Sequence, residues 1–177
     1  MAKTLISTHA ASASATLDIT SGIDSTYPVY EFHFVSIHPQ SGEQWSFQVN
    51  AAGQSGFNET MTTTFVRAYH DEGDTSTVLE YQAGLDQAEG TAYQYLSSTI
   101  GNDADQAMSG VLTLYGPSST TFVKHFVATT NTITDDDYSS NGLTAGYINT
   151  TAAIDEISFK MTSGNIDAGV IKMFGVS

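Results

Sequence analysis

The chain has 177 residues, no cysteine and a formal net charge of −14, from five Lys and Arg against nineteen Asp and Glu. This length predicts one domain that buries a core of its own, and the lack of cysteine excludes disulfides and thiolate metal sites. So acidic a surface repels phosphate backbones and anionic lipid headgroups, and we therefore expect no nucleic-acid partner and no membrane partner.

The sequence predicts neither a membrane span nor a secretion signal. No run approaches the ~18 apolar residues that a spanning helix needs. The N-terminal segment has small residues and one lysine but lacks the apolar core of a signal peptide. We expect a protein made in the cytoplasm and not secreted by the general route.

Polarity in this chain comes from uncharged side chains. Charged residues are only 14% of the total, against ~25% in ordinary globular proteins. Ser, Thr, Asn and Gln replace them, together with nine Phe and nine Tyr. This composition is common in β-sandwiches and in proteins built into large assemblies, and uncommon in metabolic enzymes.

The chain opens with a polar segment rich in Ser, Thr and Ala. We expect residues 1–15 to form an N-terminal arm or an edge strand, ordered by assembly with a neighbour, and residues 16–177 to form the domain.

Residues 30–38 and 44–49 each alternate aromatic with polar residues, which gives each segment one apolar face by the period of two. The Pro-Gln-Ser-Gly sequence between them is a turn signal. This pattern predicts a hairpin, with Trp45 and Phe47 in the core.

Residues 60–70 predict a third long strand, closed by an acidic turn. The pattern then blurs over residues 77–100, which fit a strand or a helical turn equally well.

The centre of the chain predicts another hairpin, in residues 111–130. Two β-branched and aromatic runs flank Gly-Pro-Ser-Ser, whose proline presets a turn and lacks an N–H for a ladder. Three further strands are expected over residues 145–151, 153–162 and 168–176.

The fold class follows from this order of elements. Short strands separated by turns, with no helical crossovers between them, predict an antiparallel arrangement. We predict an all-β fold, a single-domain antiparallel β-sandwich of the jelly-roll kind, with two sheets packed ~10 Å apart.

Several phrases of the sequence resemble small β-sandwich virion proteins of tailed bacteriophages, especially marine and cyanobacterial ones. The resemblance covers residues 30–176, and it rests on phrases that occur in the same order: Tyr-Glu-Phe-His-Phe at 30–34, Thr-Thr-Phe-Val-Arg-Ala-Tyr-His at 63–70, Gly-Asn-Asp at 101–103, Pro-Ser-Ser-Thr-Thr at 117–121, Lys-His-Phe at 124–126, Ser-Gly-Asn-Ile-Asp at 163–167 and Ile-Lys-Met-Phe-Gly at 171–175. It implies a place in a virion, and no catalytic motif accompanies it.

No catalytic residue and no cofactor is assigned from the sequence. A G-x-S-x-G nucleophile elbow is absent, and the acidic residues lie in polar turns where solvated carboxylates are ordinary. His33 and His38, five apart on a predicted strand, are expected on opposite faces and so unable to chelate one ion.

The remaining metal candidates are acidic loops that could supply oxygen ligands to a structural Ca²⁺. Neither loop has EF-hand spacing, and a solvated surface is the simpler interpretation. The candidates are Asp103 and Asp105 in one loop, and Asp135, Asp136 and Asp137 in the other.

Three further residues are candidates for contacts with partners. Tyr138, in an acidic loop, is the best placed aromatic residue for stacking on a glycan. Arg67 and Lys124 lie inside predicted strands of a very acidic chain, where each is expected to pair with a carboxylate in the domain or across a subunit contact.

These observations lead to two expected roles. The first is a non-enzymatic structural protein of a tailed-phage virion, most simply a capsid decoration protein that acts as a trimer or other closed oligomer. The alternative is a tail-fibre or appendage protein whose β-sandwich binds a host surface glycan. In either case the partners would be other virion proteins of the capsid or tail.

Overall fold

The computed structural model describes residues 2–177, which are built from β-strands and their connections. Among these residues, no helix is long and apolar enough to cross a membrane. The strands are β1 (Lys3–Ser14), β2 (Leu17–Ile19), β3 (Val29–Pro39), β4 (Trp45–Ala51), β5 (Met61–Asp71), β6 (Thr77–Tyr81), β7 (Gln94–Tyr95), β8 (Met108–Tyr115), β9 (Lys124–Ile133), β10 (Tyr138–Ile148), β11 (Ile154–Met161) and β12 (Ile166–Val176).

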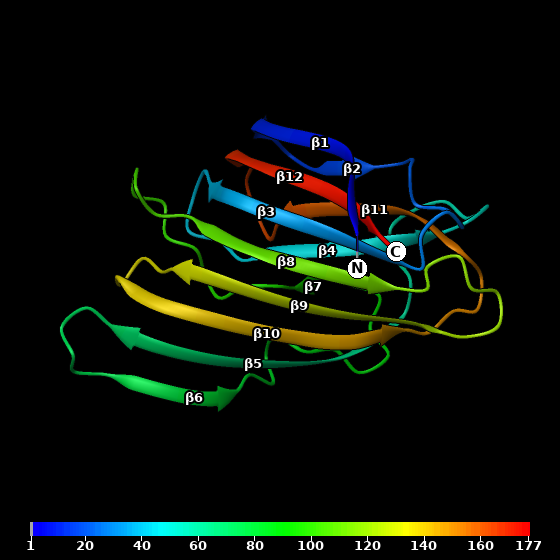
Figure 1. Cartoon of the computed structure of the whole chain (residues 1–177). Helices are drawn as coiled ribbons and strands as arrows, with labels where there is room; N and C mark the ends of the chain where they lie inside the picture. The colour runs from blue at the N-terminus through cyan, green and yellow to red at the C-terminus, as the bar shows by residue number, and fades with distance from the viewer. Residues whose placement is uncertain (1) are drawn as a thin grey trace.

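The strands form two packed antiparallel sheets, which confirms the predicted single-domain β-sandwich (Figure 1). One sheet has the order β1-β12-β3-β8-β9-β10-β5-β6, and the other has the order β2-β11-β4-β7. Without β5, β6, β9 and β10, the two sheets become β1-β12-β3-β8 and β2-β11-β4-β7. This is the strand order of an eight-stranded jelly roll. The four extra strands all extend one sheet beyond β8.

An aromatic core joins the two sheets of the jelly roll. Trp45 stacks on Phe159 with centroids 5.7 Å apart and 3° between the planes, and Phe34 meets Trp45 edge-on at 5.8 Å. All three side chains are almost fully buried. Each contributes roughly 1.5–3 kcal/mol by leaving water, so this cluster supplies much of the contact between the layers.

The hairpin predicted for residues 30–49 is wrong in its pairing, although both strands exist. β3 pairs with β12 and β8, whereas β4 pairs with β11 and β7. The two strands face each other across the core instead of lying side by side. Two strands with apolar faces have the same alternation in either arrangement, so the pattern could not distinguish a hairpin from a crossing between sheets.

The central hairpin is confirmed. β8 and β9 pair antiparallel from Met108 opposite Thr132 to Tyr115 opposite His125, and residues 116–123 connect them. The strand predicted from residue 145 begins earlier, at Tyr138 in β10. The first half of β10 is Tyr-Ser-Ser-Asn-Gly, with little strand propensity. It is a strand because β9 and β5 both pair with it.

The segment expected as an arm or edge strand is β1, the edge strand of the larger sheet. It pairs with β12 from Lys3 opposite Val176 to Ser14 opposite Ile166. Only Ile6 and Ala11 of this strand pack against the core, which explains why its sequence is so polar.

A β-bulge in β3 places His33 and His38 on the same face of the sheet. Ser36 has a φ of +51°, and the pairing of β3 with β8 shifts between Phe34 and Ile37, which are both buried in the core. The neighbours His33 and His38 therefore both point away from the core. The expectation that they lie on opposite faces is wrong, because one extra residue changes the alternation.

A polar segment covers the inner side of the extra strands. Residues 82–100, with no helix and only the short β7, lie beneath them. Thr63 donates to the Gln94 side chain over 2.7 Å, and the Thr130 hydroxyl donates to the Leu96 carbonyl over 2.6 Å. The interior is thus aromatic within the jelly roll and rich in hydroxyls and amides beneath the extension.

Candidate binding surfaces

The first candidate surface is the side of the eight-stranded sheet that is turned away from the four-stranded sheet, here called the outer face. Strand alternation places apolar side chains on it, because their neighbours in sequence are buried in the core. Seven large hydrophobic side chains of this sheet are well exposed: Leu5, Val35, Leu79, Tyr81, Tyr115, Val127 and Leu143. A sheet face in contact with water ordinarily carries polar residues at these positions.

The pairing register arranges the outer face in rows that cross the strands. One row is formed by Lys172, His33, Val111, Thr129, Leu143, Val66 and Tyr81. The next row is formed by Phe174, Glu31, Thr113, Val127, Ala145 and Thr64. Across β8, β9, β10 and β5 these rows combine apolar side chains with threonines, and their charged or titratable members, Lys172, His33 and Glu31, lie on β12 and β3.

Few acidic residues belong to the strands of the outer face. Of the nineteen Asp and Glu, only Asp167, Glu31, Asp71 and Glu80 belong to strands of this sheet. Asp71 and Glu80 alternate to the inner side, and Asp167, exposed at the start of β12, lines a depression with Ser36 and His38 at the end of the strands. Glu31 is on the outer face, where it pairs with Lys3 at 2.6 Å and His33 at 2.7 Å.

The negative charge of Glu31 is balanced by its two partners, Lys3 and His33. Partial burial favours the neutral form of this carboxyl, but the hydrogen bonds from Lys3 and His33 outweigh it and hold the Glu31 pKa below its ordinary value. The charge of Glu31 is therefore already compensated within the sheet.

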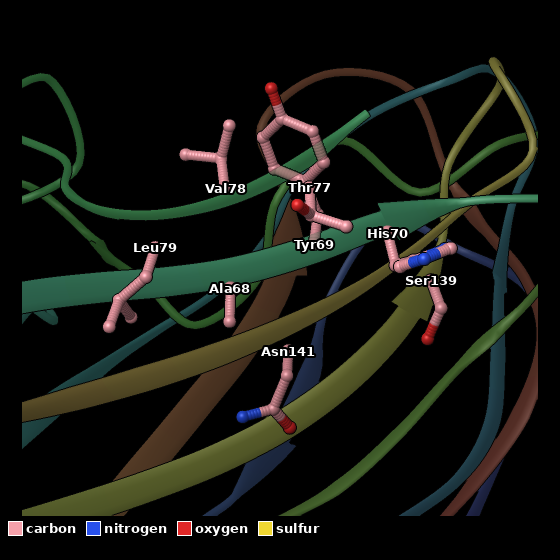
Figure 2. A pocket seen from close by; sticks show the side chains of 8 residues that line it. All are labelled: Ala68, Tyr69, His70, Thr77, Val78, Leu79, Ser139 and Asn141. Carbon is pink, nitrogen blue, oxygen red and sulfur yellow. The ribbon is translucent and has the colours of Figure 1, made fainter. Parts of the chain in front are cut away.

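The outer face is hollowed where small residues lie between large ones. One such depression, of about 510 Å³, lies around Ala68. Figure 2 shows Leu79, Asn141 and Ser139 on the same side of the strands as Ala68. Tyr69 and Val78 point to the opposite side. The depression is wide and open, a shape that suits an inserted side chain of another protein.

The second candidate surface is a cleft on the inner side of the extension, here called the tyrosine cleft. It has a volume of about 220 Å³, and its lining residues come from β5, the start of β10 and two connecting segments: Arg67, Tyr69, Ser98, Thr99, Thr134, Asp135, Asp136 and Tyr138.

Two stacked tyrosines and an arginine form one wall of the tyrosine cleft. The Tyr69 and Tyr138 rings stack at 5.2 Å with 12° between their planes, and the Arg67 guanidinium lies 5.0 Å from the Tyr69 centroid. Tyr138 is opposite Asp71 in the ladder, so it approaches Tyr69 from the side away from Arg67. Arg67 also pairs with Glu80 of β6 at 2.7 Å.

Gln106 braces the acidic loop of the cleft. Its buried amide donates to the Thr134 carbonyl over 3.2 Å and to the Asp137 carboxylate over 3.1 Å. Its oxygen accepts from the backbone N–H of Asp103 over 3.0 Å. One side chain thus links the two loops considered for Ca²⁺. Asp137 serves this contact, while Asp135 and Asp136 remain exposed at the cleft.

The candidate residues do not all come together in one place. Arg67, Tyr138, Asp135 and Asp136 come together in the tyrosine cleft. Asp103 and Asp105 lie in the neighbouring loop, exposed. Among residues 2–177, no group of three or more acidic or histidine side chains is arranged to hold a metal ion.

Lys124 does not reach either candidate surface, which corrects its assignment as an interface residue. Its side chain is fully buried, and its ammonium donates to the carbonyls of Thr150 at 3.2 Å and of Ala152. Burial lowers the Lys124 pKa, and the charge of Glu59 opposes this shift. The residue fastens the connection from β10 to β11.

No pattern in the sequence marks Gln106 or Glu80 as part of a site. Gln106 is a polar residue after a turn and Glu80 is a polar residue within β6, and both kinds of position are common.

Comparison with known proteins adds no identification: no protein-family model matches the chain, and no curated protein matches it.

Proposed function

We propose that this chain is a non-enzymatic structural protein of a tailed-phage virion that docks onto its neighbours through the outer face. The observation that carries the proposal is the combination on that face of exposed apolar side chains and a near absence of acidic ones. Apolar patches of this kind mark interaction sites in proteins. Depletion of charge distinguishes the centre of an interface from other surface.

The virion setting is supported by the sequence resemblance to small phage β-sandwich proteins. The jelly roll is also the fold of many viral capsid domains, although a fold alone hosts many functions. Decoration of the capsid lattice agrees best with a compact domain that offers one broad face, and a trimer or other closed oligomer would cover part of that face.

The proposal is tested with Val127→Glu/Leu143→Glu, which places two charges on the outer face at exposed positions. A matched control adds two charges at exposed loop positions, Ser21→Glu/Thr120→Glu. Purified virions carrying each version are compared on a quantitative stained gel. The unmodified chain and the control should be present in many copies per particle, and the face variant should be missing from particles although it folds normally.

Two results would contradict the proposal. The first is absence of the unmodified chain from purified particles, which would remove the virion role. The second is full incorporation of the face variant, which would assign docking to another surface. Light scattering on the isolated proteins provides the oligomeric state of each version.

A further inference from the structure

We propose that the tyrosine cleft binds a neutral pyranose sugar unit of a glycan. This activity does not depend on the docking role above, because the cleft lies on the inner side of the extension and the docking residues lie on the outer face. The proposal rests on the aromatic wall, the polar groups that line the cleft and the charge of the cleft.

The aromatic wall provides a flat and rigid platform. Tyr69 lies between Arg67 and Tyr138, with ring and guanidinium contacts at 5.2 and 5.0 Å. Aromatic rings offer large apolar surface with few rotatable bonds. Arg67 and Tyr138 cover the two faces of Tyr69, so the ring face left for a sugar is that of Tyr138 turned away from Tyr69. One face of a pyranose carries mainly C–H groups, which pack on such a ring face. A platform that is already stacked loses little conformational freedom when the sugar binds.

The cleft also offers partners for sugar hydroxyls. Asp135 and Asp136 are exposed carboxylates that accept hydrogen bonds, and Arg67 presents guanidinium N–H donors beside its contact with Glu80. The loop is fixed, because Gln106 holds the Thr134 carbonyl and the Asp137 N–H donates to the same carbonyl over 3.0 Å. Neighbouring sugar hydroxyls can therefore meet preorganised acceptors.

The size and charge of the cleft narrow the ligand class. Its volume of about 220 Å³ is below the ~300–1,000 Å³ of pockets for drug-sized ligands, which favours a single sugar ring. Arg67 brings one positive charge to the cleft and is already paired with Glu80, whereas Asp135 and Asp136 bring two negative charges. This excess of negative charge disfavours sialic and uronic acids, so the cleft selects neutral sugars.

The test is saturation-transfer NMR of the full chain with the methyl pyranosides of glucose, galactose, mannose and N-acetylglucosamine. Glucuronic acid and N-acetylneuraminic acid are the anionic comparisons. We expect at least one neutral sugar to receive saturation at its ring C–H protons, and both acids to bind at least about tenfold more weakly. Tyr138→Ala should weaken binding of the neutral sugar about tenfold. Tyr115→Ala, which removes an exposed tyrosine of the outer face, should have no effect on binding.

Asp136→Asn gives a second readout that leaves the aromatic stack in place. It should weaken binding of the neutral sugar and reduce the difference in affinity between the neutral sugar and the two acids. The proposal is overturned if none of the four neutral sugars binds, if binding persists in Tyr138→Ala, or if the acids bind as well as the neutral sugars. Because virion incorporation is measured separately, either proposal can fail while the other stands.

Discussion

Asp71 shows how one carboxylate orders a turn at the end of a strand. It accepts hydrogen bonds from the backbone N–H groups of Thr75 at 2.9 Å and Ser76 at 2.8 Å, and from the Thr75 hydroxyl. The Thr75 hydroxyl and these N–H groups stabilise the charged form and lower the Asp71 pKa from its ordinary value of 3.8. The contacts connect β5 to β6.

The sign of the resulting pH dependence follows from linkage. A carboxyl with a lower pKa in the folded state stabilises the fold above its unfolded pKa. This stability is lost as the pH falls through the folded pKa, because the unfolded state takes up the proton first.

We therefore expect Asp71→Asn to be less stable than the unmodified chain at pH 7, with a difference that shrinks below about pH 4. Chemical unfolding at pH 7 and at about pH 3 measures the difference. Glu72→Gln, at an exposed neighbour, is the control and should match the unmodified chain at both values. A difference that stays constant with pH would show that the carboxylate charge has no part in the turn.

At the scale of elements, β1 is the least buried long strand of the sandwich. Deleting residues 1–14 should destabilise the domain by about 2–3 kcal/mol through lost burial of Ile6 and Ala11, in addition to the lost ladder with β12. It also exposes the edge of β12, which promotes aggregation. Denaturant titration and sedimentation measure the two effects.

Hydrogen exchange locates the effect of this deletion. The β12 amides that bond to β1 should exchange much faster, whereas amides in the β9–β10 ladder should stay protected. Unchanged protection of β12 would mean that β1 contributes little to the sheet, as expected of an arm that binds a neighbour instead.

The sequence predicted the strands better than their partners. The alternation of residues 30–38 and 44–49 marked two strands, but the cross-layer contact of Phe34 with Trp45 depends on chain topology that alternation does not encode. The start of β10 was missed because Ser139, Ser140 and Asn141 form a strand only through tertiary pairing.

The same limit applies to the candidate surfaces. Arg67 and Tyr138 stood out individually, yet nothing in the sequence placed them together, since they meet only through the pairing of β5 with β10. The apolar outer face could not be predicted from the sequence for a related reason. An apolar residue such as Val127 or Leu143 reads as core in a strand pattern, and only the fold shows that it is exposed.

At the scale of the whole molecule, charge and apolar surface are separated. The chain carries a net charge of −14, yet few acidic residues belong to the strands of its outer face, and Glu31 among them is already paired with Lys3 and His33. Copies of the chain repel one another at a distance, while the surface proposed for contact carries little charge of its own.

Self-association through the outer face should therefore strengthen with salt. Raising NaCl from ~0.05 to ~0.5 M shortens the screening length to a few ångströms and weakens the long-range repulsion without breaking apolar contacts. Sedimentation velocity at both salt concentrations measures the oligomer fraction. An oligomer that dissociates as salt rises would instead implicate intermolecular ion pairs, with Lys172 the first residue to examine.

Because Lys124 is buried, covalent labelling of its amine can detect local opening of the native state. An amine-reactive reagent attacks exposed lysine side chains, and this chain has exposed or partly exposed amines at Lys3, Lys160 and Lys172. Lys124 is sealed in the interior with its protons engaged by two carbonyls. Its modification then reports opening of the β10–β11 connection, and the other three lysines provide an internal standard in the same mass spectrum.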